Sequence, residues 1–191
     1  HTSNIDPIIK IMGNRRPIHY LAKEGHFNKQ PNRTIMLSTG QIETFRKTGG
    51  RDALARAIDV LEAGLCLGLF PEGTRSRNRK SPYLQKGKTG IARIAASFPN
   101  VPIIPMCIDG ARDMMAPGDN MIKFWKKVKV IIDEPITFNQ WIINKEGGNK
   151  NNREVSNLID ISSEEREIEM RILYRKFTDQ IMGNLKELGA P

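Results

Sequence analysis

A short apolar run that ends in a polar, arginine-rich loop constrains the fold of this chain more than any other feature. Residues 65–70 are almost uniformly apolar, and a proline, an acid, a glycine, a hydroxyl and an arginine follow directly. Such a run is too short for a surface helix and is typical of a strand buried on both faces of a sheet. Open α/β sheets hold their ligands at the carboxyl ends of their strands. The sequence therefore predicts a functional loop over residues 71–88, at the edge of a sheet.

Helical and extended segments alternate around this loop. Apolar residues at helical spacing predict a helix over residues 51–63, and Gly64 is a typical helix stop. A second helix is predicted over residues 90–98 and a second buried strand over residues 101–108. This order is that of a βαβ unit. We therefore expect an α/β fold with a mostly parallel mixed sheet flanked by helices on both faces.

The pattern before and after this central part predicts shorter elements. Residues 18–22 are a predicted strand, and residues 23–28 a predicted helical segment. Residues 34–38 are either a strand or the end of a surface loop. Alternating residues over 127–133 predict a later strand, nearer to an edge of the sheet.

The length of 191 residues is that of a single domain, large enough to bury a core. We expect its core to span about residues 1–138. A segment rich in Asn, Gly and Lys predicts a mobile loop over about residues 144–161. Ser162 and Glu165 form a capping box, which opens a predicted C-terminal helix over about residues 163–188.

The charge balance is basic, with 30 Lys and Arg against 21 Asp and Glu and a net charge of +9. Basic domains attract phosphate groups, on nucleic acid, on an anionic membrane or on a cofactor. Aromatic residues are only 6% of the chain, and it has neither an RNP-like motif nor zinc-finger spacing, so nucleic acid is the weaker choice. No apolar run approaches the roughly 20 residues that a membrane span requires.

The chain opens on a histidine and a carboxylate, His1 and Asp6, with four residues between them. An imidazole is suited to remove a proton from an alcohol, and a carboxylate on its other nitrogen would fix its tautomer. Taken alone, Asp6 is explained as the N-cap of a helix over residues 7–12. Because a strand ordinarily leads into such a catalytic loop, we expect the sequence to begin inside a longer protein, with its N-terminal part missing.

Four blocks of this sequence resemble those of the glycerolipid acyltransferases, in the same order. They are H-x-x-x-x-D from His1 to Asp6, Gly-x-Ile-x-x-x-Arg at residues 40–46, F-P-E-G-T-R-S at residues 70–76 and Val-Pro-Ile-x-Pro at residues 101–105. The resemblance implies a PlsC-like 1-acylglycerol-3-phosphate acyltransferase. Such an enzyme moves a fatty acyl chain from acyl-CoA or acyl-carrier protein to the free hydroxyl of 1-acylglycerol 3-phosphate, making phosphatidic acid for phospholipid synthesis.

The resemblance also implies a role for each matching residue. His1 is the general base and Asp6 orients it, with no metal and no tightly bound cofactor. The residues implied on the phosphate side of the acceptor are Lys23, Arg46, Glu72, Gly73, Thr74 and Arg75. Pro102 and Pro105 are implied on the side of the acyl donor, and both also prevent full pairing of their strand.

The chemistry of the residues supports part of this assignment and leaves alternatives. Gly73 lets the backbone approach a ligand closely, and Arg75 offers a fork of donors that matches phosphate oxygens. Glu72 could orient Arg75 or accept a hydrogen bond from a glycerol hydroxyl. A strand-end turn with a surface ion pair is the alternative for these residues. Lys23 and Arg46 are also explained as solvated surface residues.

The expected partners are a lysophospholipid, an acyl donor and an anionic membrane surface. Acyl-carrier protein is one candidate for the donor, and nucleic acid is not an expected partner. The expected location is the cytoplasmic face of a membrane, peripheral or anchored by a segment upstream of residue 1. Alternatives are acylation of glycerol 3-phosphate or of another lysophospholipid, a non-catalytic anionic-lipid binder, and a basic nucleic-acid module. The two non-enzymatic alternatives do not explain a histidine and an aspartate placed before an F-P-E-G-T-R-S loop.

Overall fold

The computed structural model describes most of the chain after residue 16. The described residues are 17–28, 30, 32–44, 50–76, 78, 80–116, 119, 121–160 and 162–190. They form two compact units. Unit 1 holds the described residues up to Phe70 together with Gly110–Val128, and unit 2 holds Pro71–Asp109 together with residues 129–190. The helix predicted over residues 7–12 lies outside the described residues.

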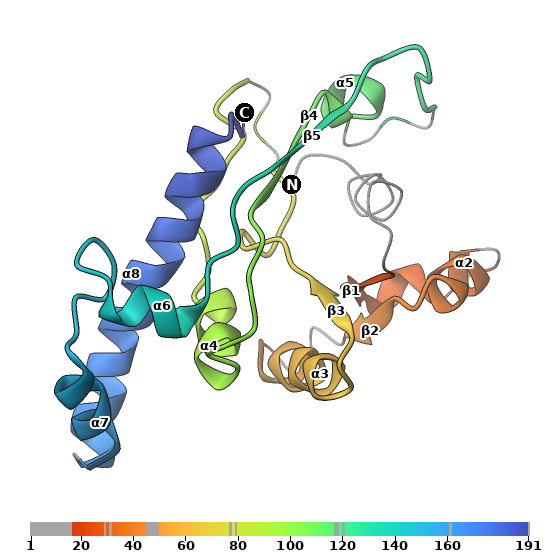
Figure 1. Ribbon diagram of the computed structural model, residues 1–191. Coiled ribbons are helices and arrows are strands. Elements are labelled where there is room, and N and C mark those ends of the chain that lie inside the picture. Colours follow the sequence, from red (N-terminus) through yellow and green to blue (C-terminus); the bar gives the residue numbers. More distant parts are fainter. Residues whose placement is uncertain are drawn as a thin grey trace. The chain divides into compact units, whose positions relative to one another are not determined.

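Unit 1 is built on a three-stranded parallel sheet (Figure 1). The central strand is β1 (Ile18–Lys23), and it pairs in parallel with β2 (Ile42–Thr44) on one side and β3 (Cys66–Gly68) on the other. Parallel pairing places the carboxyl ends of the three strands at the same edge of the sheet. Together with the helices, this sheet confirms the predicted α/β class.

Helix α3 (Gly50–Glu62) is the helix that the apolar spacing predicted before the strand leading into the loop, which is β3. Its buried residues are Ala57 and Val60, on the face that packs against the sheet. Gly64 has φ +71°, and its N–H donates to the carbonyl of Leu61 over 3.0 Å. A glycine in this left-handed conformation closes the helix as its sequence position predicted.

Two elements before α3 differ from their predictions. Residues 34–38 belong to helix α2 (Asn32–Ser38) instead of a strand or loop. The hydroxyls of Ser38 and Thr39 both donate to the carbonyl of Ile35, so short polar side chains supply hydrogen bonds at the end of this helix. The β-branched residues of the segment had favoured the prediction of a strand. The helical segment predicted over residues 23–28 is a single 3₁₀ turn, η1 (Glu24–His26).

The prediction that the run before the loop is buried on both faces was wrong. Leu65 is 47% exposed and Cys66 is also exposed. The physical reason is the strand order β2-β1-β3, which puts β3 at an edge of the three-stranded sheet. The side chains of an edge strand are covered less completely than those of a central strand. The uniform apolarity of residues 65–70 therefore did not show where β3 lies in the sheet.

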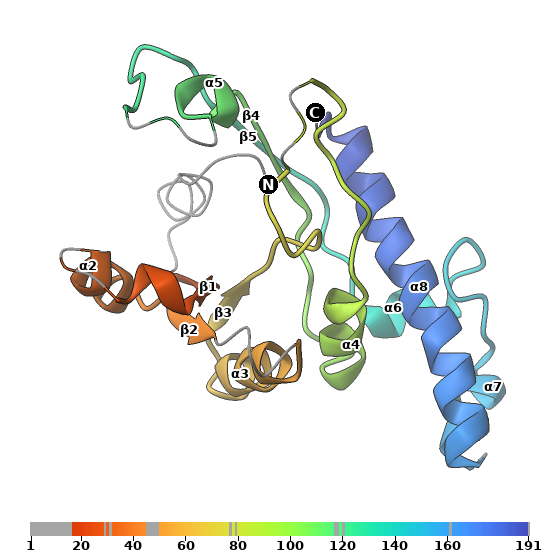
Figure 2. The same ribbon diagram turned by 180° about the vertical axis from the view of Figure 1, so that it is seen from behind.

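Unit 2 is organised around the long helix α8 (Ser163–Glu187), which is 25 residues long. Helices α4 (Gly90–Ser97) and α6 (Phe138–Ile143) pack against it (Figure 2). The rings of Phe138, Trp141 and Phe177 contact one another, with centroids 4.9–5.5 Å apart. These rings form the centre of a helical core.

The capping box at the start of α8 is confirmed. The hydroxyl of Ser162 accepts the N–H of Glu165 over 3.2 Å and donates to the carboxylate of Glu165 over 2.8 Å. The helix continues to Glu187, close to the predicted end. None of the helices in the described part of the chain is long and apolar enough to cross a membrane.

The strand predicted over residues 101–108 begins later than expected. Only β4 (Met106–Asp109) is regular, and it pairs antiparallel with β5 (Lys129–Ile132), the later strand that the sequence predicted. Pro105 has no N–H and instead accepts the N–H of Asp133 at its carbonyl over 3.0 Å. Because the proline removes a ladder donor, the regular pairing starts only after it.

The loop predicted over residues 144–161 contains a helix, α7 (Asn152–Asp160). The side chain of Asn151 accepts the N–H of Glu154 over 2.9 Å, and the carboxylate of Glu154 accepts the N–H of Asn151 over 2.7 Å. This reciprocal pair is a capping box that the polar composition concealed. Before it, Lys150 binds Glu169 of α8, and this hydrogen bond raises the pKa of Lys150.

Candidate functional site

The strand that leads into the F-P-E-G-T-R-S loop is anchored by an aromatic pair. Phe70 stacks on Tyr20 of β1, with ring centroids 5.4 Å apart. A Cβ on Gly68 would lie 2.5 Å from the Cζ atom of Tyr20, so only glycine leaves room for that ring. The chain therefore leaves the carboxyl edge of the parallel sheet at a fixed point, and the loop over residues 71–88 begins there.

The loop is closed on itself by two hydrogen bonds that join its ends. The N–H of Lys88 donates to the carbonyl of Pro71 over 2.8 Å. The N–H of Gln85 donates to the carboxylate of Glu72 over 3.0 Å. Glu72 is only 3% exposed, and a buried carboxylate is tolerated where hydrogen bonds replace its water. Glu72 thus holds the two arms of the loop together from inside unit 2.

Gly73 lies beside the side chain of Lys88. Its φ is +69°, a conformation that favours glycine. A Cβ at this position would lie 2.9 Å from the Cδ atom and 3.0 Å from the Nζ atom of Lys88. The missing side chain therefore lets a lysine cross the turn and places its ammonium group next to the loop backbone. The sequence had predicted that Gly73 makes room for a ligand, and the structure shows the lysine that uses this room.

The three residues after Gly73 differ in exposure. Thr74 is exposed, Arg75 is half-buried, and Ser76 is fully buried at 0%. The hydroxyl of Ser76 accepts the N–H of Asn78 over 3.4 Å, which is a weak bond. The serine thus faces the interior of the unit, whereas the threonine hydroxyl remains accessible to a ligand.

Helix α8 supports the returning arm of the loop, which sequence reasoning missed. The Nη1 atom of Arg175 donates to the carbonyl of Gly87 over 2.8 Å, and Arg175 also binds Asp179 one turn further along the helix. A Cβ on Gly87 would lie 2.8 Å from Thr178 and 2.7 Å from Met182. An arginine and an aspartate four residues apart usually indicate a solvated ion pair, so the sequence carried no signal for this contact.

Lys23, and Gly40 at the start of the second block, both lie in unit 1. Lys23 is the last residue of β1 and is paired in register with Thr44 of β2, so it stands at the carboxyl edge of the sheet. Gly40, at the start of the second block, has φ +69°, and its carbonyl lies 2.7 Å from the Nδ1 atom of His19. This contact fixes the turn that leads into β2 and towards Arg46.

The remaining predicted site residues are not tested by the geometry. His1, Asp6 and Arg46 lie outside the described residues, so their convergence with Arg75 stays a prediction. Pro102 is exposed and Pro105 is buried, both in the irregular segment before β4. Among the described residues, no group of three or more His, Cys, Asp or Glu side chains could hold a metal ion.

Comparison with known proteins identifies relatives of this chain. Residues 1–109 match the model of the family described as Acyltransferase. The chloroplastic 1-acyl-sn-glycerol-3-phosphate acyltransferase BAT2 of Brassica napus is 36% identical over 86 residues, which are 44% of this chain and 24% of that protein. The 1-acyl-sn-glycerol-3-phosphate acyltransferase of Bacillus subtilis is 28% identical over 120 residues, which are 62% of this chain and 54% of that protein.

A solved structure shares the fold. The crystal structure of the 1-acyl-sn-glycerophosphate acyltransferase PlsC from Thermotoga maritima matches with a TM-score of 0.62 at 23% identity. The match covers all of this chain and 64% of that one. This chain thus spans about half of the Bacillus relative and less than two thirds of the solved one.

Proposed function

Because the chain belongs to the Acyltransferase family, we propose that it moves a fatty acyl chain onto the free hydroxyl of 1-acylglycerol 3-phosphate, with phosphatidic acid as the product. The observation that carries this proposal is the F-P-E-G-T-R-S loop, which follows the carboxyl edge of a parallel sheet and is closed by a buried carboxylate. The names of the relatives in Brassica and Bacillus support the choice of acceptor.

The loop offers cationic groups suited to a phosphate monoester. Arg75 presents a planar fork that can bind two phosphate oxygens at once. Lys88 adds a compact positive charge beside Gly73. In the proposal Arg46 and Lys23 bind the same phosphate from the second block and from the end of β1. Glu72, Gly73 and Thr74 shape the pocket, with Glu72 acting through its bond to the backbone of Gln85.

In the proposed reaction, His1 takes the proton of the acceptor hydroxyl as the oxygen attacks the carbonyl carbon of a thioester. Asp6 holds the imidazole in the correct tautomer and stabilises the imidazolium. The new C–O bond forms, the C–S bond breaks, and the departing sulfur receives the proton from the imidazolium. Much of the rate increase comes from holding the alcohol and the thioester in reactive geometry. The scheme uses neither a covalent acyl-enzyme nor a metal ion.

We propose acyl-CoA or acyl-carrier protein as the acyl donor, with Pro102 and Pro105 on its side of the site. Since the acceptor is a membrane lipid, the proposed place of action is the cytoplasmic face of a membrane. Attachment there is peripheral or through a segment upstream of residue 1. The net charge of +9 favours an anionic surface.

The test is acyl transfer from oleoyl-CoA to lysophosphatidic acid by the wild-type protein and by His1→Ala. Loss of a general base should lower turnover roughly 10²- to 10⁴-fold. His26→Ala, at a histidine to which no role is assigned, is the matched control and should retain turnover. Turnover by His1→Ala at the wild-type level would contradict the assignment of the base. Liposome binding without any product would instead favour a non-catalytic lipid binder.

A further inference from the structure

A short segment of unit 1 combines large apolar residues with lysines and has no acidic residue. It reads Met-Ile-Lys-Phe-Trp-Lys-Lys-Val from Met121 to Val128. We call residues 121–127 the aromatic tip. Its three largest apolar side chains are the most exposed large hydrophobic residues in the described part of the chain, with Met121 at 70%, Phe124 at 80% and Trp125 at 71%. Single exposed apolar residues are ordinary, but three within five positions form a patch that needs an explanation.

The two aromatic side chains stand at the corners of a tight turn. The N–H of Lys126 donates to the carbonyl of Lys123 over 3.0 Å, which places Phe124 and Trp125 at the two central positions. These positions usually hold Gly, Asn, Asp or Pro, because those residues adopt the backbone angles of a turn easily. A Phe-Trp pair there exposes both rings to solvent.

The base of the aromatic tip is fixed by contacts within unit 1. The N–H of Lys123 donates to the carbonyl of Met114 over 2.9 Å, at the end of α5 (Ala111–Met114). The carboxylate of Asp119 accepts the N–H of Ala116 and the ammonium of Lys123, each over 3.2 Å. These bonds attach Lys123, the first residue of the turn, to the end of α5 and to Asp119.

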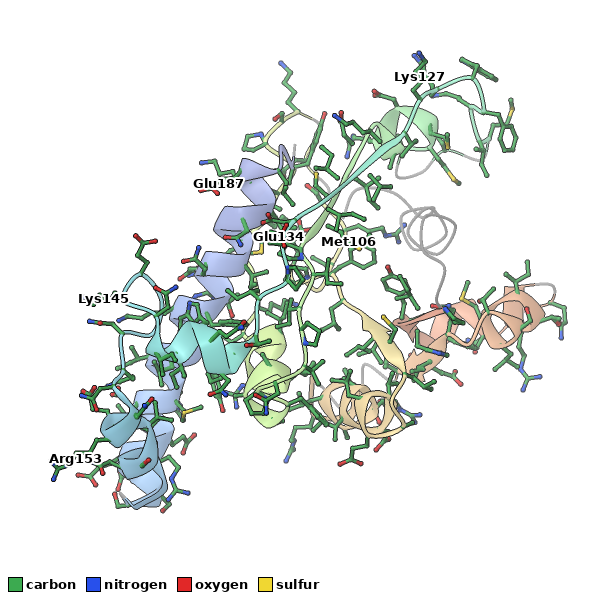
Figure 3. All side chains as sticks on the ribbon, viewed as in Figure 1. Met106, Lys127, Glu134, Lys145, Arg153 and Glu187 are labelled. Carbon is green, nitrogen blue, oxygen red and sulfur yellow. The ribbon has the colours of Figure 1, made fainter. Side chains whose placement is uncertain are left out.

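The charges around the rings select one kind of partner. Lys126 and Lys127 are exposed, and Figure 3 shows Lys127 pointing away from the ribbon. The centres of protein–protein interfaces are depleted in lysine, which argues against a second protein as the occupant. Trp is favoured at the interface between lipid headgroups and acyl chains, and lysines beside it can bind anionic headgroups.

We propose that the aromatic tip inserts Phe124 and Trp125 into an anionic lipid surface, with the flanking lysines on the headgroups. The proposal deepens the proposed function, because it rests on a lipid acceptor that must be reached at a membrane. It assigns the contact with the membrane to a turn of unit 1, separate in sequence from all four blocks. Binding to lipid is measured without turnover, so failure of this proposal and failure of the proposed activity can be told apart.

The test uses the two tryptophans of the chain. Trp141 is 3% exposed, and its Nε1 atom has no hydrogen-bond partner among the described residues, so Trp141→Phe should fold and leave Trp125 as the reporter. Vesicles of equal parts phosphatidylcholine and phosphatidylglycerol should shift the emission of Trp125 to the blue. Brominated acyl chains should quench it. Pure phosphatidylcholine vesicles should have a much weaker effect.

Variants separate the contribution of the rings from that of the charges. Phe124→Ser with Trp125→Ser should weaken vesicle partitioning of the 191-residue chain at least roughly tenfold, because the apolar area no longer enters the bilayer. Lys126→Gln with Lys127→Gln should weaken it about 25-fold at low salt, since each lysine near an anionic surface contributes about fivefold. Ile168→Ser, at an isoleucine of α8 that is 55% exposed, is the matched control and should bind as wild type.

Equal partitioning of the serine double variant and the wild type would overturn the proposal. Emission of Trp125 that is unchanged by anionic vesicles would overturn it as well. A third contrary result is a loss of self-association, or of binding to duplex DNA, in the serine double variant while vesicle binding persists. That result would assign the aromatic tip to a second copy of the chain or to nucleic acid.

Discussion

Two basic regions of this molecule, the loop over residues 71–88 and the aromatic tip, differ in which side chains they bury and which they expose. The loop hides polar groups, with Glu72 3% and Ser76 0% exposed. The aromatic tip exposes apolar ones, with Phe124 and Trp125 more than 70% exposed. Positive charge in both regions indicates an anionic partner. The side chains that each region buries or exposes indicate the form of this partner. Organised polar groups suit a single bound phosphate, and exposed rings suit an extended surface.

Among the changes that test this comparison, removal of the arginine of the loop should have the largest effect. Arg75→Ala should lower kcat/KM for lysophosphatidic acid about 10- to 100-fold, because hydrogen bonds to a charged group are lost. Arg75→Lys keeps the positive charge but lacks the fork of donors, so its kcat/KM should lie between those of the wild type and Arg75→Ala. Both variants should partition into anionic vesicles as the wild type does. A large loss of vesicle binding by Arg75→Ala would remove the distinction between the two regions.

A smaller effect is expected where the loop rests on α8. Gly87→Ala should lower the free energy of unfolding by about 1–3 kcal/mol, because its Cβ would meet Thr178 and Met182. Gly183→Ala, within α8, is the matched control, since a Cβ there meets nothing within 4 Å. It should raise stability by about 0.5–1 kcal/mol. Urea unfolding of both variants measures the difference, and equal shifts would show that the loop does not rest on the helix.

The smallest effect is expected at the base of the aromatic tip. The N–H of Ala116, and then the hydrogen bond from Lys123, hold the pKa of Asp119 below its ordinary value of 3.8. A carboxyl whose pKa is lower in the folded state stabilises that state above its unfolded pKa. The stabilisation is lost as the pH falls through the folded pKa. Carboxyl NMR should therefore find Asp119 titrating below 3.8.

Asp119→Asn keeps an acceptor for the N–H of Ala116 and removes the ion pair with Lys123. Since the ion pair of Asp119 with Lys123 is partly open to solvent, this variant should change vesicle binding by less than about twofold. Its urea stability should also lack the acid-dependent loss that Asp119 gives the wild type as the pH falls from the unfolded pKa of 3.8 through the lower folded pKa. An ordinary pKa for Asp119, or an identical acid profile for the variant, would show that the carboxylate does not hold the aromatic tip.

Elements with local signals could be predicted from the sequence. The apolar spacing before Gly64 gave α3, and the capping box at Ser162 gave the start of α8. Predictions failed where a distant contact decided the outcome. The edge position of β3 depends on strand order, and the late start of β4 depends on the pairing of Pro105 with Asp133. Neither strand order nor cross-strand partners are visible in a local pattern.

The candidate site was predictable in its residue types but only partly in their contacts. The motif gave the position of Glu72 and Gly73, but the sequence did not show that the first binds Gln85 and the second makes room for Lys88. The aromatic tip did carry a signal. Two aromatic residues flanked by lysines, in a segment without helical or strand periodicity, can be recognised as an exposed turn.

The bond between the buried carboxylate of Glu72 and the N–H of Gln85 has a consequence for experiments that report on mobility. A stretch with no helix or strand is commonly expected to exchange its amide hydrogens quickly and to be an early target for proteases. Here the amides of Gln85 and Lys88 both have acceptors within the unit. Deuterium uptake should therefore be slow at these two positions, and the returning arm should resist digestion as a helix does.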